Sequence, residues 1–320
     1  MFGFTWEDVL RIAHDAEAGG FRNIWLSDHL FLGDRISLDC LETWSTLAAI
    51  AACTTKIRIG AMVTCQTYRN PALLAKIAAS IDRISGGRLD FGIGAGWKEN
   101  EYLAYGYDFP ATGVRIDQLA ETLEICTRLW TEERATFHGT HYRIDDAPCS
   151  PKPLQQPLPV WIGGGKPRIM RLAAKWAHGF NYLTGGFPTA DRVAPAMREL
   201  DDVCRAVGRD PKSLRRSVVL FVIVARSRAE VDAIVAEQAQ FRGPVAAWRA
   251  SGFRTSADSF TATELLSSQP QLIAGTPDEV RDRLKEYAAA GADDANLRFA
   301  YRHERAMTQL FGTDVMPALQ

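Results

Sequence analysis

The stretch Arg58-Ile59-Gly60-Ala61-Met62-Val63-Thr64 decides how the rest of the chain is interpreted. It is a short apolar run that opens into a polar segment, Thr64–Pro71. An amphipathic pattern follows over Ala72–Ile84, directly after a proline of the kind tolerated in the first turn of a helix. The stretch therefore predicts a buried strand, a loop at its carboxyl end and a helix.

The same layout recurs before and after this stretch. Helical patterns alternate with seven apolar runs that we expect to be strands: Phe21–Leu26, Lys56–Val63, Arg88–Gly94, Pro159–Ile162, Gly179–Leu183, Ser217–Val224 and Ala295–Phe299. Such alternation predicts an α/β fold with a parallel sheet and right-handed crossovers. A (β/α)₈ TIM-like barrel has eight strands and begins with one, whereas this chain begins with a helix pattern capped by Thr5. We therefore predict a barrel whose first strand is absent or truncated.

The length of 320 residues suits one barrel, because α/β barrels of 250 or more residues commonly fold as one unit. We predict a single domain over residues 1–320. Residues 240–269 break the rhythm, and we interpret them as an insertion before the last helix–strand unit. Two short alternating runs within Ala135–Ile144 predict a β-hairpin.

Composition excludes several classes of function. The formal net charge of -1 gives no reason to expect nucleic acid or an anionic membrane as partner, and no apolar run reaches the ~20 residues that span a bilayer. The N-terminus has no secretion signal. The six cysteines form no C-x-x-C pair, which favours reduced thiols and a cytoplasmic location. The six histidines have no H-E-x-x-H spacing, so we expect no metal site.

The active site of such a barrel lies where its strands end. Asp28 and His29 come directly after the first apolar run, and His29 next to a carboxylate suits a general acid or base. A structural histidine bonded to a loop is about equally plausible from position alone. Met62, Val63 and Thr64 form the second strand end.

Two glycine-rich strand ends resemble nucleotide motifs without matching them. Gly92–Gly96 lacks the third glycine of a dinucleotide fingerprint, since that position is Trp97. A flat ring lying against the backbone near Gly96 explains the small residues as well as close packing does, and Asn100 offers a donor and an acceptor for a heterocycle.

The second glycine-rich end is Gly163-Gly164-Gly165-Lys166, where Pro167 replaces the Ser or Thr of a P-loop. Three glycines before a helix still present backbone N–H groups at a positive helix end, which suits one phosphate. A flexible β/α turn is the alternative. We favour phosphate binding.

Several separate motifs in order resemble the bacterial-luciferase-like superfamily, and within it the deazaflavin (coenzyme F420)-dependent oxidoreductases. The resemblance rests on WLSDH (25–29), RIGAMVTCQTYRNPALLAKIAASIDRISGGRLDFGIGAGWKENEYLAYGYDFP (58–110), RIDQLAETLEICTRLWTEE (115–133), the stretch from Phe137 to Asn181, and IAGTPDEVRDRL (273–284). It covers nearly the whole chain except Gln240–Gln269.

The resemblance implies a barrel that binds F420 or FMN at its carboxyl-end mouth. It implies a cis Met62-Val63 peptide bond in a bulge that backs the ring, with Asp28 and His29 facing the ring. It also implies that Asn100 contacts the ring edge and that Gly163–Gly165 hold the phosphate. This chain departs from the related sugar-phosphate dehydrogenases at Trp97, where they have a catalytic glutamate. It also lacks their strand before Thr5.

From these features we predict an F420-dependent oxidoreductase that moves a hydride to or from a small organic substrate. In this hypothesis His29 handles the substrate proton. Two alternatives remain: an FMN-dependent luciferase-like monooxygenase, and a cofactor-free barrel without catalysis. The resemblance further implies a homodimer.

Overall fold

The computed structural model describes residues 3–31, 39–183, 187–240 and 271–319. Contacts group the chain into two compact units. Unit 1 takes the described residues of Met1–Ala13, Arg22–Leu32 and Ile36–Phe180, and unit 2 takes those of His14–Phe21 and Asn181–Gln320. The expected insertion, apart from its first residue, lies outside the described residues. The single-domain assignment stays a prediction.

The strands of unit 1 run parallel in the order β1 (Asn23–Leu26), β2 (Arg58–Ala61), β4 (Leu89–Gly94) and β7 (Val160–Gly164). Every residue of β4 is buried, as expected for an interior parallel strand covered on both faces. This arrangement confirms the predicted α/β class with a parallel sheet.

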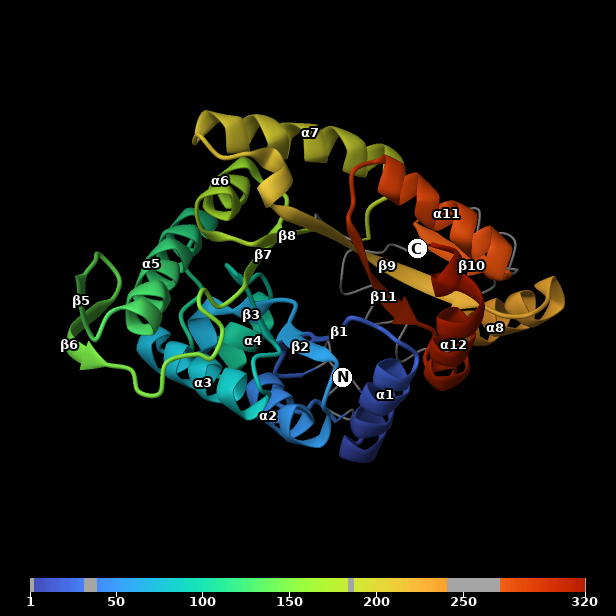
Figure 1. Cartoon of the computed structure of the whole chain (residues 1–320), viewed down its shortest axis with the longest axis horizontal. Coiled ribbons are helices and arrows are strands. Elements are labelled where there is room, and N and C mark those ends of the chain that lie inside the picture. Colours follow the sequence, from blue (N-terminus) through green and yellow to red (C-terminus); the bar gives the residue numbers. More distant parts are fainter. Residues whose placement is uncertain (1–2, 32–38, 184–186, 241–270, 320) are drawn as a thin grey trace. The chain divides into compact units, whose positions relative to one another are not determined.

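Three helices cover the outer side of these strands: α2 (Thr43–Cys53), α3 (Pro71–Ile84) and α5 (Thr112–Thr131) (Figure 1). Each helix turns its apolar stripe inward, so that Leu47, Leu74 and Leu119 are fully buried. The short helix α4 (Glu99–Ala104) follows β4, and α6 (Pro167–Trp176) follows β7.

The first described element is α1 (Trp6–Ala18), and no strand precedes it among described residues 3–5. Thr5 and Asp8 cap its start reciprocally, because each backbone N–H donates to the other side chain at 3.2 Å. The predicted hairpin is confirmed as the antiparallel pair β5 (Arg134–His138) and β6 (Arg143–Pro148).

In unit 2 the strand β9 (Arg215–Val224) pairs in parallel with β10 (Leu272–Gly275) and with β11 (Asp294–Phe299). β8 (Gly179–Tyr182) precedes them in the chain. The helices of this part are α7 (Ala190–Ala206), α8 (Arg228–Gln240), α11 (Pro277–Ala289) and α12 (Glu304–Leu310). Short 3₁₀ or π-helical turns complete the described elements of both units. One lies in unit 1 (Gln66–Tyr68), and the others lie in unit 2 (Pro211–Ser213, Phe311–Val315 and Met316–Ala318).

Two of these elements correct the expectation of seven strands and their helices. β10 was missed because its four residues make too short an apolar run to stand out beside a helix start. α8 was missed because its apolar residues are spread around the helix and mark no single face, although Val231 and Val235 are fully buried. Within the described part of the chain, no helix is long and apolar enough to cross a membrane.

Candidate active site

The strand that was expected to run through Val63 stops at Ala61, which corrects the prediction. The Met62-Val63 peptide bond is cis, as predicted, and pairing with β4 resumes in β3 (Thr64–Cys65). Ile59 pairs with Leu89, an offset of 30, whereas Thr64 pairs with Ile93, an offset of 29. One extra residue is therefore accommodated between β2 and β3, which makes this strand end a β-bulge.

Glycines make room for the side chain that follows the cis bond. A Cβ on Gly94 would lie 2.6 Å from Cγ2 of Val63, and a Cβ on Gly163 would lie 2.8 Å from its Cγ1. Both distances are shorter than van der Waals contact, so Val63 occupies a space that exists only because the ends of β4 and β7 carry no side chain there. Met62 and Val63 themselves are half-buried.

Gly96 is needed for a different reason. Its φ is +77°, and a Cβ there would lie 1.8 Å from the hydroxyl of Tyr102 and 2.8 Å from Sγ of Cys65. Cys65 Sγ and the Tyr102 hydroxyl are themselves 3.0 Å apart and buried. Gly96 thus closes the loop after β4 onto the residues that follow the bulge.

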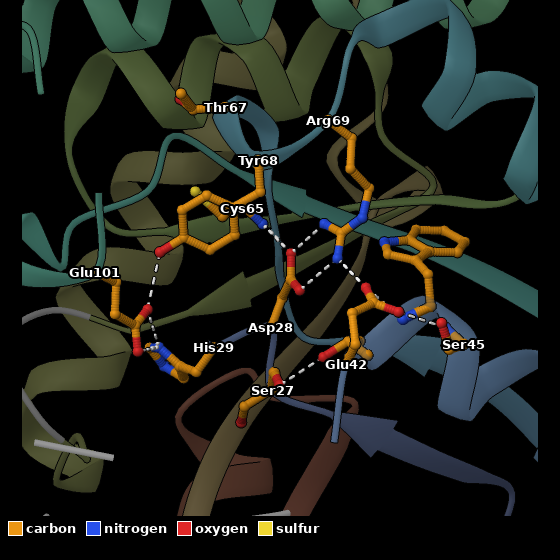
Figure 2. Close-up of polar contacts among 12 residues, drawn as sticks. Ser27, Asp28, His29, Glu42, Ser45, Cys65, Thr67, Tyr68, Arg69 and Glu101 are labelled. Carbon is orange, nitrogen blue, oxygen red and sulfur yellow. Dashed lines mark hydrogen bonds and ion pairs between the residues drawn. The ribbon is translucent and has the colours of Figure 1, made fainter. Parts of the chain in front are cut away.

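Asp28 ties the end of β1 to the segment after the bulge. Its carboxylate accepts the backbone N–H of Cys65 at 2.9 Å and two hydrogen bonds from the guanidinium of Arg69, at 2.8 and 3.0 Å (Figure 2). Arg69 also pairs with Glu42, and Glu42 caps α2 by accepting the N–H groups of Trp44 and Ser45. One ion-pair network, buried at Asp28 and exposed at Glu42, therefore links the end of β1, β3 and the start of α2.

His29 faces a different carboxylate, that of Glu101 on α4. Its Nδ1 lies 3.0 Å from Oε2 and 3.2 Å from Oε1 of Glu101 (Figure 2). Tyr68 donates its hydroxyl to Oε2 at 2.8 Å, and Lys98 donates to Oε1 at 2.6 Å. The Glu101 side chain is completely buried, while that of His29 keeps 19% of its surface exposed. The histidine is the solvent-facing member of this cluster.

Charge in the cluster is well defined. Burial alone would raise the pKa of Glu101, but the hydrogen bonds from His29, Lys98 and Tyr68 lower it to about 2. Burial, with the charges of neighbouring groups, raises the pKa of Tyr68 far above its ordinary value, so that Tyr68 stays a donor. An ionised carboxylate can only accept hydrogen bonds. Nδ1 of His29 therefore carries a hydrogen atom and donates a hydrogen bond to Glu101.

The remaining predicted residues lie at the same strand ends with fewer contacts. Asn100 is exposed on the first turn of α4, next to Glu101. Gly163 and Gly164 close β7, and Gly164 has φ +148°. Gly165 and the exposed Lys166 lead into α6. Thr64 is fully buried, and within the described part of the chain its hydroxyl has no hydrogen-bond partner.

Arg168, two residues after Lys166, is paired away from the glycine loop. Its guanidinium donates to Asp117 at 2.5 Å and to the carbonyl of Gly113 at 3.4 Å, both on α5. Among the described residues, no group of three or more histidines, cysteines or carboxylates has the geometry of a metal site.

Sequence reasoning missed five residues of the two networks: Glu42, Tyr68, Arg69, Lys98 and Glu101. The strand-end rule pointed to the two loops that carry Tyr68, Arg69, Lys98 and Glu101, and it did not point to Glu42 at the start of α2. It did not distinguish Glu101 from Glu99, because only the turn of α4 buries one and exposes the other. It also assigned Asp28 to His29 as its carboxylate, whereas the carboxylate bound at Nδ1 of His29 belongs to Glu101.

The model of the luciferase-like monooxygenase family matches residues 3–294. The chain belongs to this family. Among luciferase-like relatives, an F420-dependent glucose-6-phosphate dehydrogenase of Amycolatopsis mediterranei (strain U-32) is 27% identical over 327 residues, covering 98% of this chain and 94% of the relative. An F420-dependent hydroxymycolic acid dehydrogenase of Mycobacterium tuberculosis is 30% identical over 231 residues, covering 72% and 62%.

Solved luciferase-like structures share the fold. An F420-dependent secondary alcohol dehydrogenase, solved with an F420–acetone adduct, superimposes with a TM-score of 0.83 at 21% identity, covering 100% of this chain and 96% of that one. The monooxygenase RslO1 from Streptomyces bottropensis superimposes with a TM-score of 0.79 at 24% identity, covering 98% and 94%. The family thus contains both F420-dependent dehydrogenases and monooxygenases.

Proposed function

We propose that this chain is an F420-dependent oxidoreductase that moves a hydride between the deazaflavin and a small organic molecule. The observation that carries the proposal is the bulge at Met62-Val63, which lies beside an imidazole held by a buried carboxylate. Leu26 pairs with Ala61, so Asp28-His29 and Met62-Val63 leave the sheet at the same level of two adjacent strands. The F420-dependent relatives that align over most of the chain support the choice of cofactor.

The residues at these strand ends fit a flat ring with a phosphate-bearing chain. The half-buried residues Met62 and Val63 offer a surface for the deazaflavin ring, because the Val63 side chain packs into the space left by Gly94 and Gly163. The unpartnered hydroxyl of Thr64 gives a buried polar atom whose hydrogen bond a ligand would complete. Asn100 suits the ring edge, as the resemblance implies.

The glycine loop suits the phosphate. Gly163, Gly164 and Gly165 leave the backbone accessible at the N-terminus of α6, a helix of ten residues, and Lys166 is exposed there. With Arg168 paired to Asp117, Lys166 is the cation of this loop that we assign to the phosphate.

When bound, F420 supplies an obligate two-electron hydride exchange with little reactivity toward oxygen. The protein positions the cofactor ring and the substrate, excludes water, and takes up or supplies the substrate proton. Since Nδ1 of His29 is held by Glu101, Nε2 is the atom that exchanges a proton with the substrate. Tyr68 and Lys98 act through Glu101, because they hold in place the carboxylate that orients the imidazole ring of His29.

Asp28, which the sequence placed with His29 as a catalytic residue, is better assigned to positioning. Both of its oxygens are engaged by Arg69, and one also by the N–H of Cys65. In this role Asp28 holds the segment after the bulge at a fixed height against β1, and thus holds the surface on which the ring rests.

An FMN-dependent monooxygenase is the second candidate. A pyrimidine monooxygenase of Stutzerimonas stutzeri is 33% identical over 189 residues, covering 58% of this chain and 50% of the relative. A cofactor-free barrel is the third. A cytoplasmic location agrees with the six cysteines, none of which is in a disulfide, and a homodimer follows from the resemblance; both belong to the proposal.

Titration of the purified chain with F420 and, separately, with FMN tests the proposed function. We expect saturable quenching of deazaflavin fluorescence at micromolar concentration and much weaker binding of FMN. Tighter binding of FMN would favour the monooxygenase. Binding of neither would favour the cofactor-free barrel.

A further inference from the structure

An exposed tryptophan lies against the acid–base histidine. The rings of Trp97 and His29 have centroids 5.9 Å apart and planes at 86°, an edge-to-face contact. Trp97 nevertheless keeps 58% of its surface exposed, which is unusual for so large an apolar side chain. It begins the loop between Gly96 and α4, so the backbone holds it at the end of β4.

Two cations among the described residues near His29, Lys98 and Arg69, are paired with carboxylates. Lys98 donates to Glu101 and to the carbonyl of Phe31 at 2.7 Å, and its ammonium lies 4.8 Å from the centre of the Phe31 ring. Its side chain is only 11% exposed. Arg69, equally buried, is committed to Asp28 and Glu42. An anionic substrate group beside His29 would therefore meet a paired cation in each case.

Trp97 offers a substrate a flat apolar face. A saturated sugar ring can lay only its C–H groups on that face, and its hydroxyl groups need hydrogen-bond partners elsewhere. A flat apolar molecule instead gains stacking and loses only ordered water.

We propose, resting on the function proposed above, that Trp97 is a specificity-determining residue and that the substrate is an uncharged, flat, conjugated ketone or aldehyde. Its π-system stacks on Trp97, and its carbonyl oxygen lies toward Nε2 of His29. Phosphorylated sugars bind less well in this proposal, because Lys98 and Arg69, the described cations beside His29, are already paired with carboxylates.

Calorimetric binding to the F420-loaded protein tests this substrate class with two probes, benzylideneacetone and glucose 6-phosphate. We expect benzylideneacetone to bind at least about tenfold more tightly than glucose 6-phosphate, and Trp97→Ser to weaken its binding by roughly tenfold. Trp97→Phe should retain most of the affinity. Tyr105→Ser is the matched control, because Tyr105 is also 58% exposed but stacks on Phe31.

An unchanged affinity of the Trp97→Ser protein for benzylideneacetone, or tighter binding of glucose 6-phosphate to the wild type, would overturn the substrate class. Fluorescence titration of F420 with the same proteins separates the two levels. If F420 binds and benzylideneacetone does not, the substrate class is wrong and the cofactor assignment stands. If F420 does not bind, both fail.

Discussion

His29 owes its orientation to three residues from two segments of the chain. Glu101 on α4 accepts a hydrogen bond from Nδ1 of His29. Tyr68, after the bulge, donates a hydrogen bond to one oxygen of that carboxylate, and Lys98 donates one to the other oxygen. Such a buried carboxylate with all its partners in place fixes both the tautomer and the ring plane. In the proposed function, Nε2 is the ring nitrogen that exchanges a proton with the substrate.

Replacing His29 by alanine should reduce turnover by roughly 10²–10⁴-fold, the range typical of a lost general acid or base. Affinity for F420 should stay within about twofold, since the ring rests on the bulge rather than on the imidazole. His14→Ala, at an exposed histidine on α1, is the control. Turnover by the His29→Ala protein at the wild-type rate would remove the acid–base role.

Glu101 gives a prediction for stability against pH. Its pKa is about 2 in the folded protein and near its ordinary value of 4.5 in the unfolded chain. The unfolded chain therefore takes up the proton first, and the stabilisation by this carboxylate is full above about pH 5 and lost as the pH falls toward 2. Urea unfolding of wild type and Glu101→Gln measures it.

At pH 7 the Glu101→Gln protein should be less stable by about 1–3 kcal/mol, because three donors (His29, Tyr68 and Lys98) lose the charged carboxylate that accepts their hydrogen bonds. The difference should shrink as the pH falls from 5 to about 3. A difference that stays constant across this range would show that the Glu101 charge does not stabilise the folded state.

At this scale the cis Met62-Val63 bond could be predicted, because a family resemblance implies it. The role of His29, which follows from a strand end and the same resemblance, stays a prediction. The partner of His29 was out of reach. Glu99 and Glu101 differ by only two positions, and the direction in which α4 leaves the loop decides which of them is buried.

At the scale of elements, the bulge depends on three strand ends that fit one another. Val63 fills the space left by Gly94 and Gly163, so its position is set by β4 and β7 rather than by β2 alone. An uninterrupted apolar run gave no sign that the strand breaks at Ala61. The extra residue is revealed only by the register in which β2 and β3 each pair with β4.

Gly163→Ala should weaken F420 binding by roughly tenfold, since the new methyl would displace Val63 and with it the surface under the ring. The double variant Val63→Ala/Gly163→Ala should recover part of that loss, because both Cγ atoms that the methyl meets are gone. A double-mutant cycle of F420 dissociation constants measures the coupling. Additive effects would mean that Val63 and Gly163 act independently.

At the scale of the whole molecule, alternation of strands and helices was enough to predict the α/β class and the parallel order of unit 1. The contents of unit 2 were harder to predict. β10 has four residues, and α8 has little helical periodicity in its apolar residues, so neither carries a clear local signal. Their place comes from pairing with β9 and packing in its neighbourhood, which are tertiary effects.

The proposed cofactor site lies entirely within unit 1, on the segments after β1, β2, β4 and β7. Hydrogen–deuterium exchange with and without saturating F420 tests that assignment most directly. Peptides covering residues 58–69 and 160–168 should exchange more slowly when F420 is bound, while the hairpin of β5 and β6 should be unaffected. Protection confined to other segments, or none at saturation, would contradict the site.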